Sequence, residues 1–284
     1  MIIPKFWRKF RRNRAAIAGL ALVAFFLLIA GMAPMLAPQD PFALSQQSLR
    51  PPSGAHLLGT DDLGRDILSG VLYGSRLSLA VGFLAAALST LIGIIFGALA
   101  GYYGGRLDDF LMRISELFQV VPQFFLALTI VALLGPNITN IIVVIGVLSW
   151  PTTARLMRGQ YLALRDREFV QAARSIGSKD LNIILREILP NAIPPVIING
   201  SLQVARAILL EASLNFLGVG DPKIQSWGAM LLNAQRFLTS AWWMAFFPGM
   251  AIFFTVLGFN LLGDGLNDVL NPKSQYRSRV KAVE

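Results

Sequence analysis

Long runs of apolar residues constrain this sequence more than any other feature. The first run, residues 15–36, contains no charged side chain, and as an α-helix of 22 residues it would be about 33 Å long, enough to cross a bilayer once. Further runs lie at about residues 77–100, 110–134, 138–157, 192–216 and 241–262. With 55% of its residues hydrophobic and 14% charged, the chain is too apolar for an ordinary soluble domain. We therefore predict an all-α membrane protein with six transmembrane helices.

The first apolar run follows a basic arm, which is also how a cleaved signal peptide begins. Six basic residues precede the run: Lys5, Arg8, Lys9, Arg11, Arg12 and Arg14. The apolar core of a signal peptide usually has about 7 to 15 residues, and this run is longer. We expect residues 1–36 to form a basic N-terminal arm and a retained first transmembrane helix.

The distribution of Lys and Arg predicts the orientation of the chain. If the N-terminus is cytoplasmic, six spans place 19 of the 25 basic residues inside, 5 outside and Arg206 within the membrane. Inner loops of membrane proteins are enriched in Lys and Arg, so both termini are expected inside, including a basic tail at residues 271–284. The net charge of +9 does not indicate nucleic-acid binding, because the basic residues flank apolar segments.

Two polar segments are expected on the outer side. Residues 37–76 are rich in Pro, Ser, Gln and Asp, and Thr60 is a candidate cap for a short helix lying on the membrane surface. The second segment, residues 218–240, is expected to contain a short helix capped by Ser226. Residues 77–270 as a whole would form a five-helix core.

Small residues and prolines predict how the spans pack and bend. Gly93, Gly97 and Gly101 recur every four residues, which leaves one helix face bare for close packing. Pro122 and Pro151 predict kinks in the third and fourth spans. We also expect Trp150 at the inner membrane interface, Trp242 and Trp243 at the outer one, and a helix stop at residues 263–265.

Polar side chains within the apolar runs are candidates for a transport pathway. They are Gln119, Gln123, Asn199, Gln203, Arg206 and Glu211. An Arg in the middle of a membrane helix costs about 2.5 to 3.5 kcal/mol, so Arg206 needs a polar environment. Arg206 and Glu211 are five positions apart, about 140° around a helix, and cannot simply pair with each other. The alternative is that these side chains only bind neighbouring helices.

A polar stretch, residues 165–190, separates the fourth and fifth spans on the predicted cytoplasmic side. Asp166 stands where a helix cap belongs, and Gly177 offers the left-handed conformation that commonly ends a helix. A second short amphipathic helix then runs to Pro190, which is expected to stop it. Two short helices meeting at Gly177 would form a compact lever between two spans.

This lever carries a family resemblance. Its spacing resembles the cytoplasmic loop of permease subunits in ABC importers, at residues Gln171, Ala172, Ala173, Gly177 and Pro190. That family commonly has Glu where this chain has Gln171. Four stretches narrow the resemblance: residues 58–66, 169–174, 211–218 and 260–265. Together they resemble the second permease subunit of dipeptide, oligopeptide and nickel importers over nearly the whole chain.

The resemblance implies a type I ABC importer permease fold with a coupling helix, in the bacterial inner membrane. The residues it assigns to ATPase coupling are Glu168, Gln171, Ala172, Ala173, Arg174, Gly177 and Pro190. The implied partners are a second homologous permease, two cytoplasmic ATPases that bind ATP and magnesium, an external substrate-binding protein and membrane lipid. The implied cargo is a dipeptide or oligopeptide, with nickel chelates or other small solutes as alternatives.

Several chemistries lack the residues that they need. No GxxxxGK phosphate loop occurs, so ATP hydrolysis is expected in partner subunits, and no cofactor is expected on this chain. There is no cysteine and one histidine, His56, while Asp61, Asp62 and Asp66 lack the ligand pattern of a calcium loop and are better explained as caps. No catalytic or metal site is therefore expected. An ion-driven secondary transporter is the rival hypothesis, but no internal repeat is evident.

Overall fold

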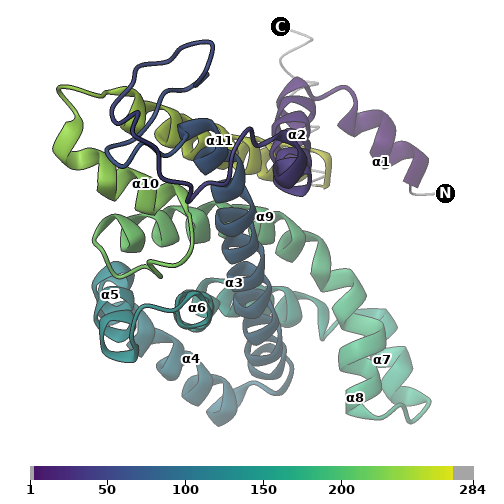
Figure 1. Ribbon diagram of the computed structural model, residues 1–284. Coiled ribbons are helices and arrows are strands. Elements are labelled where there is room, and N and C mark those ends of the chain that lie inside the picture. The colour runs from purple at the N-terminus through teal and green to yellow at the C-terminus, as the bar shows by residue number, and fades with distance from the viewer. Residues whose placement is uncertain (1–2, 271–284) are drawn as a thin grey trace, which may run out of the picture.

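The computed structural model describes residues 3–270, and this part of the chain is helical without a β-strand (Figure 1). In chain order the helices are α1 (Ile3–Phe10), α2 (Arg14–Leu36), α3 (Ile67–Tyr103), α4 (Gly105–Val120), α5 (Gln123–Leu134), α6 (Ile138–Leu164), α7 (Glu168–Ser175), α8 (Asp180–Asn182), α9 (Leu189–Phe216), α10 (Trp227–Ala234) and α11 (Trp243–Leu270). A π-helical stretch, Ile183–Ile188, joins α8 to α9, and a 3-10 turn, Gln235–Phe237, follows α10. The predicted basic tail, residues 271–284, lies outside the described residues.

Five helical segments of the described chain are long and apolar enough to cross a membrane. They are α2, α3, α6, the continuous helix Asp180–Phe216 and α11. α4 and α5 pass the same test only as a pair, bent by 83°. With the pair counted as one broken span, the predicted all-α membrane fold with six spans is confirmed.

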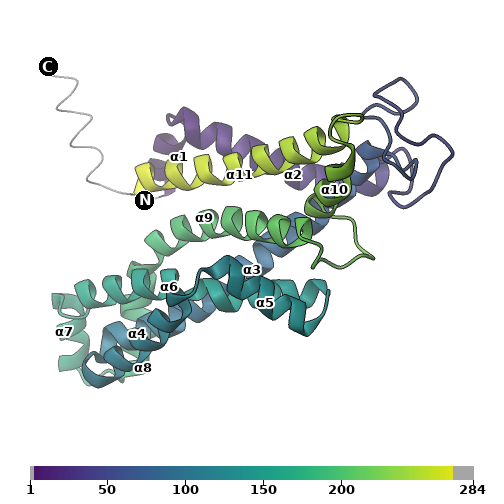
Figure 2. The ribbon, with the colours of Figure 1, turned by 90° about the vertical axis from the view of Figure 1, so that its left-hand side faces the viewer.

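The molecule has two different ends (Figure 2). One end carries the loop of residues 37–66 together with α10, and the opposite end carries α7 and α8. α1 and the last turns of α11 also lie toward the α7 end. α3 runs between the two ends and contributes to the packing along the whole length of the molecule.

Four hydrophobic cores hold the described helices together, and α3 and α9 contribute to three of them. In the first core α2, α10 and α11 pack against them, around buried side chains such as Trp227 and Phe259. In the second core α5 and α6 pack against them, around Ile145 and Leu214. α9 therefore lies between the α2–α11 layer and the layer that contains α4, α5 and α6 (Figure 2).

The predicted glycine seam is confirmed, and its partner is α6. Gly93, Gly97 and Gly101 all face α6 at close range. A Cβ added at Gly97 would lie 2.3 Å from the carbonyl oxygen of Ala154, which is closer than any side chain can approach. The absence of side chains on this face lets the two helix backbones touch.

The predicted surface helix before the second span is wrong, because both belong to one helix. α3 is capped by Asp66 rather than Thr60 and continues for 37 residues. At 1.5 Å per residue it is about 55 Å long, well beyond the roughly 30 Å hydrocarbon core. It stays helical at Gly74, where the ring of Trp227 packs 2.8 Å from the position of a Cβ.

The third span is broken rather than kinked. α4 and α5 meet at an angle of 83°, which is more than the kink predicted from Pro122 (Figure 1). Pro122 has no N–H to donate, and the preceding residue, Val121, is extended with φ −91° and ψ 134°. By contrast, α6 continues as one helix through Pro151.

The helix that starts at Asp180 does not end at Pro190, contrary to the prediction. It continues through the π-helical stretch into α9. Within that stretch hydrogen bonds reach five residues back, as from the N–H of Leu189 to the carbonyl oxygen of Ile184. The wider turn comes directly before the proline, whose missing N–H interrupts the α-helical ladder.

The predicted helix stop at residues 263–265 is also wrong, because α11 continues to Leu270. Its glycines mark close contacts between helices. A Cβ at Gly263 would lie 2.8 Å from the side chain of Leu202 on α9, and one at Gly265 would lie 2.4 Å from Cβ of Ala16 on α2. These glycines serve packing and not termination.

Two tryptophans predicted at membrane interfaces are buried. Trp150 packs against the rings of Phe96 and Phe118, whose centroids are 4.8 Å and 5.6 Å away. Trp243 donates from Nε1 to the carbonyl oxygen of Thr60 at 3.1 Å. Trp243 therefore fastens the 37–66 loop to α11. Burial among other side chains does not test the depth of either ring in the membrane, so their location at the interfaces stays a prediction.

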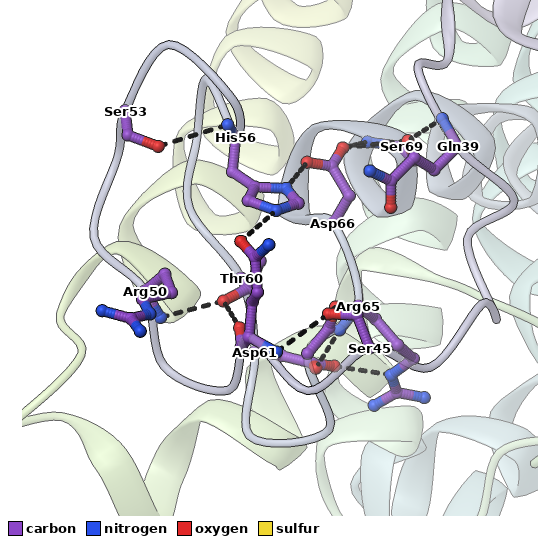
Figure 3. A network of polar contacts seen from close by, with 12 residues as sticks. Gln39, Ser45, Arg50, Ser53, His56, Thr60, Asp61, Arg65, Asp66 and Ser69 are labelled. Atoms are coloured by element: carbon purple, nitrogen blue, oxygen red, sulfur yellow. Dashed lines mark hydrogen bonds and ion pairs between the residues drawn. The ribbon is translucent and has the colours of Figure 1, made fainter.

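Polar contacts fold the 37–66 loop against the start of α3 (Figure 3). His56 lies between Oδ1 of Asp66 and Oε1 of Gln47, each 3.1 Å from a ring nitrogen. The other carboxylate oxygen of Asp66 caps α3. Asp61 accepts hydrogen bonds from both the backbone N–H and Nε of Arg65. Asp66 thus acts as a cap, as expected from the sequence, whereas Asp61 stabilises the turn of residues 61–65 and caps no helix.

Candidate pathway hollow and coupling segment

A hollow of about 640 Å³ opens beside the corner between α4 and α5. Residues of α6 and α9 complete its walls. Four of the six predicted pathway residues line it: Gln119, Gln123, Gln203 and Arg206. Gln119 and Gln123 were expected on one helix, and they reach the hollow from two helices because the chain turns between them.

Two glutamines tie the walls of the hollow together. Nε2 of Gln123 on α5 donates to Oγ of Ser149 on α6 at 2.6 Å. Nε2 of Gln203 on α9 donates to the backbone oxygen of Ser149 at 3.2 Å and to Oγ of Ser89 on α3 at 3.4 Å. Side-chain amides hold membrane helices in register in this way, so Gln123 and Gln203 position the walls as well as line them. Ser149, the shared acceptor, was not predicted, although a lone serine in an apolar run was an available signal.

Arg206 is the exposed cation of the hollow. It faces the same space as Gln203 and Ser213, as their spacing along the helix predicts. Within residues 3–270 its guanidinium makes no hydrogen bond or ion pair. An unpaired guanidinium can bind a carboxylate through two parallel hydrogen bonds.

The other two predicted pathway residues, Asn199 and Glu211, do not line this hollow. Nδ2 of Asn199 donates to Oγ1 of Thr153 on α6 at 3.0 Å. The carboxylate of Glu211 is buried and accepts from Oγ of Ser78 on α3 at 3.1 Å and from Nδ2 of Asn215. Both side chains connect neighbouring structure, which is the alternative role considered for them.

Asn215 extends the contacts of Glu211 to the short helix α10. Its Nδ2 also donates to Oγ of Ser226 at 2.7 Å. Ser226 accepts from the N–H of Ala229 and so caps α10, as predicted. One buried polar cluster therefore joins α3, α9 and α10.

A second hollow of about 280 Å³ lies between α4 and α6, nearer the α7 end. Five charged residues line it: Asp108 and Arg158, which form a bidentate pair, and Asp109, Glu116 and Arg155. Within the part of the chain that the structure describes, these last three make no ion pair. None of them was predicted as a pathway residue. Charged side chains near a membrane edge are ordinarily solvated, so their position in the sequence does not indicate that they line a pathway.

α7 buries one face and exposes the other. Val170 and Ala173, the latter 8% exposed, pack in a core of this chain with Tyr161 and Ile184. The exposed side chains are those of Glu168, Phe169, Gln171, Ala172, Arg174, Ser175 and Ile176. Ala173 thus faces the inside of its own subunit, and the face available to another protein is the one that carries Ala172.

The sequence predicted the end of α7 correctly, but not its start. Gly177 has φ +79°, the left-handed conformation expected for it. The predicted cap is wrong: Arg167 occupies the N-cap position, and no side chain caps the helix. The backbone oxygen of Asp166 instead accepts from Nε2 of Gln171 at 3.1 Å.

Three polar contacts fasten residues 165–190, which we call the coupling segment, to α3 and α6. Oη of Tyr102 donates to Oδ1 of Asp180 at 2.6 Å, and Oη of Tyr161 donates to the backbone oxygen of Ile184 at 3.0 Å. Nη1 of Arg165 donates to the backbone oxygen of Gly101 at 3.2 Å. The coupling segment is therefore held to the transmembrane helices by side chains as well as by the chain itself.

Two protein-family models match this chain, and one of them spans both the hollow and the coupling segment. Residues 93–276 match the family described as binding-protein-dependent transport system inner membrane component. Residues 5–52 match the N-terminal TM domain of oligopeptide transport permease C. The first match includes every residue that lines either hollow.

Curated relatives are similar over most of their length. The chain is 42% identical to a dipeptide transport system permease protein of Alkalihalophilus pseudofirmus, covering 94% of this chain and 88% of the relative. It is 41% identical to the dipeptide transport system permease protein of Bacillus subtilis, covering 94% and 84%. It is also 41% identical to a glutathione transport system permease protein of Pectobacterium atrosepticum, covering 95% and 90%.

A solved structure has the same fold at low sequence identity. A chain of the MetNI methionine ABC transporter in an inward-facing conformation superposes with a TM-score of 0.57 at 18% identity. The match covers 72% of this chain and 98% of that one. It supports the type I importer permease fold.

Proposed function

This chain belongs to the family of binding-protein-dependent transport system inner membrane components, and from that membership we propose that it forms half of a peptide pathway through the membrane. It is a multi-pass inner membrane permease subunit of an ABC transporter. The observation that carries the proposal is the hollow of about 640 Å³, which has both apolar and polar side chains on its walls and the guanidinium of Arg206 unpaired among them. Sites for small molecules commonly have volumes of about 300 to 1,000 Å³.

A dipeptide or short peptide is the cargo that suits this hollow. The relatives named for dipeptide and glutathione transport support this class of solute. A peptide ends in a carboxylate, which Arg206 binds through paired hydrogen bonds. Gln119 and Gln123 offer uncharged donors and acceptors to a peptide backbone.

A pathway needs partners on both sides of the membrane. A second, homologous permease covers the hollow and turns it into an enclosed path, and an external binding protein delivers the cargo at the end that carries the 37–66 loop. Two cytoplasmic ATPases bind ATP and magnesium and supply the work, because this chain has no GxxxxGK loop. This chain itself transports and does not hydrolyse ATP.

The ATPases contact the exposed face of α7. Its surface includes Glu168, Gln171, Ala172, Arg174 and Ile176, and Ile176 is 83% exposed. The basic-residue count supports a cytoplasmic location for this end, where α1 and the last turns of α11 also lie.

Reconstitution of the whole transporter tests the proposal. The chain is coexpressed with its partner subunits, purified and placed in lipid vesicles, and ATP hydrolysis is measured with and without binding protein and a dipeptide. We expect the ATPases to copurify and the dipeptide to stimulate hydrolysis and uptake. Stimulation by a nickel chelate and not by the dipeptide would identify the chelate as the cargo. Uptake by this chain alone, driven by an ion gradient, would overturn the proposal.

A further inference from the structure

Tyr102 lies at the junction between α3 and the coupling segment. Its ring is 6% exposed and belongs to the core that contains Val170 and Ala173, the buried face of α7. Its hydroxyl donates to Oδ1 of Asp180, on α8, at 2.6 Å. Cζ of Arg174, in the last turn of α7, lies 5.5 Å from the centre of the ring. One side chain of α3 therefore contacts residues on both sides of Gly177.

The chain itself connects the coupling segment to α6 and α9 but not to α3. α7 follows α6 directly, and α8 continues into α9 through the π-helical stretch. A displacement of the coupling segment reaches α6 and α9 through covalent bonds. It reaches α3 only through noncovalent contacts, because α3 ends at Tyr103 and turns into α4. These contacts are the packing of α6 on the glycine seam, the hydrogen bond from Arg165 to Gly101, and the contacts of Tyr102 with the coupling segment on both sides of Gly177.

α3 can carry such a displacement to the other end of the molecule. It is one helix of 37 residues, so its two ends move together. At its start, Asp66 caps the helix and pairs with His56 in the 37–66 loop. One turn further on, the backbone oxygen of Val71 accepts from Nε1 of Trp227 on α10 at 3.0 Å. α3 thus connects the coupling segment to the 37–66 loop and to α10 at the opposite end of the molecule.

We propose that Tyr102 is a positioning residue through which the coupling segment moves α3, so that its hydroxyl is needed for coupling and not for assembly. The proposal rests on the proposed function, in which ATPases act on α7. A hydrogen bond to a charged acceptor favours an arrangement of helices that contains it over one that lacks it by about tenfold or more. Without it, α7 moves with α6 and α9 while α3 follows less completely.

The test compares Tyr102→Phe with Tyr103→Phe in the reconstituted transporter. Tyr103 is the adjacent residue, is 51% exposed and stacks edge-on against Tyr102, but its hydroxyl has no hydrogen bond within the described chain. Uptake of a labelled dipeptide and ATP hydrolysis are measured together, and their ratio is the readout. We expect the peptide carried per ATP to fall about threefold to tenfold in Tyr102→Phe and to stay at the wild-type value in Tyr103→Phe.

A second variant removes the acceptor of the same hydrogen bond, the carboxylate of Asp180. Asp180 is exposed, so Asp180→Ala is compatible with folding even if Tyr102→Phe is not. We expect Asp180→Ala to lower the ratio as Tyr102→Phe does, and the double variant to be no worse than either, because all three lack the same bond. An unchanged ratio in Asp180→Ala, or a lower melting temperature with an unchanged ratio in Tyr102→Phe, would overturn the proposal.

The outcome separates this proposal from the proposed function. If wild-type transporter does not retain its ATPases, or if peptide does not stimulate hydrolysis, the proposed function fails. If wild type couples normally and both variants couple equally well, the proposed function stands and Tyr102 has no positioning role.

Discussion

Arg158 on α6 holds Asp108 on α4 in a bidentate pair, with Nε 2.5 Å from Oδ1 and Nη2 2.6 Å from Oδ2. The two residues are 50 positions apart in the sequence. Asp108 is buried, while the side chain of Arg158 is 36% exposed. α4 and α5 meet at a sharp corner at Pro122. The pair joins α4 to α6 on the side of this corner that is nearer to α7.

Asp108→Ala is expected to lower stability because it removes both hydrogen bonds of Arg158. Charged hydrogen bonds of this kind contribute about 1 to 3 kcal/mol, and the partial exposure of Arg158 favours the lower part of that range. Thermal unfolding of the purified transporter in detergent measures the effect. Asp109→Ala is the control, because Asp109 is exposed and makes no ion pair in residues 3–270. Equal melting temperatures for the two variants would contradict the role of the pair.

Gly97→Ala is expected to force α3 and α6 apart. The new Cβ would lie 2.3 Å from the carbonyl oxygen of Ala154, a backbone atom that cannot rotate away. Overpacking of this kind costs about 1 to 3 kcal/mol. Gly159→Ala on α6 is the matched control, because a Cβ there meets nothing within 4 Å. The yield of folded protein and its melting temperature should fall for Gly97→Ala and stay near wild type for Gly159→Ala.

Ala172→Trp and Ala173→Trp are expected to fail in different ways. Ala172 is exposed, so a tryptophan there leaves the subunit folded and obstructs the surface offered to the ATPases. Ala173 is buried, so a tryptophan there has no room and should destabilise this chain itself. The two measurements are membrane-inserted yield and the amount of copurified ATPase. A well-folded Ala172→Trp subunit that retains its ATPases would place the docking surface elsewhere.

Arg206→Leu is expected to weaken transport of peptides with a free C-terminus by about tenfold, because it removes a charged donor pair to the carboxylate. Peptides with an amidated C-terminus should be affected little. Competition between the two kinds of peptide for uptake gives the ratio directly. Arg113→Leu is the control, since Arg113 is exposed on α4 but does not line the hollow. An unchanged preference in Arg206→Leu would assign Arg206 a structural role.

Local patterns in the sequence predicted the spans and several of their details. Apolar length alone indicates a membrane helix, because each span must satisfy its own backbone in lipid. The glycine seam on α3, the cap at Ser226 and the left-handed Gly177 were also predicted, since each depends on residues close together in the sequence. The polar face of α9 was predicted in part, with Gln203 and Arg206 in the hollow and Glu211 turned away from it.

Tertiary structure decided where helices end and which face of α7 is free. Pro190 and Gly263 are stop signals in isolation, but a π-helical turn absorbs the proline and a neighbouring helix needs the glycine for close contact. Ala172 and Ala173 are identical side chains, and only packing against α6 and the π-helical stretch distinguishes the exposed one from the buried one. Sequence by itself determined what must lie in the membrane, because burial in lipid is a property of one segment. Helix ends, the hollow and the contacts of Tyr102 depend on residues far apart in the chain, so only the packed structure decided them.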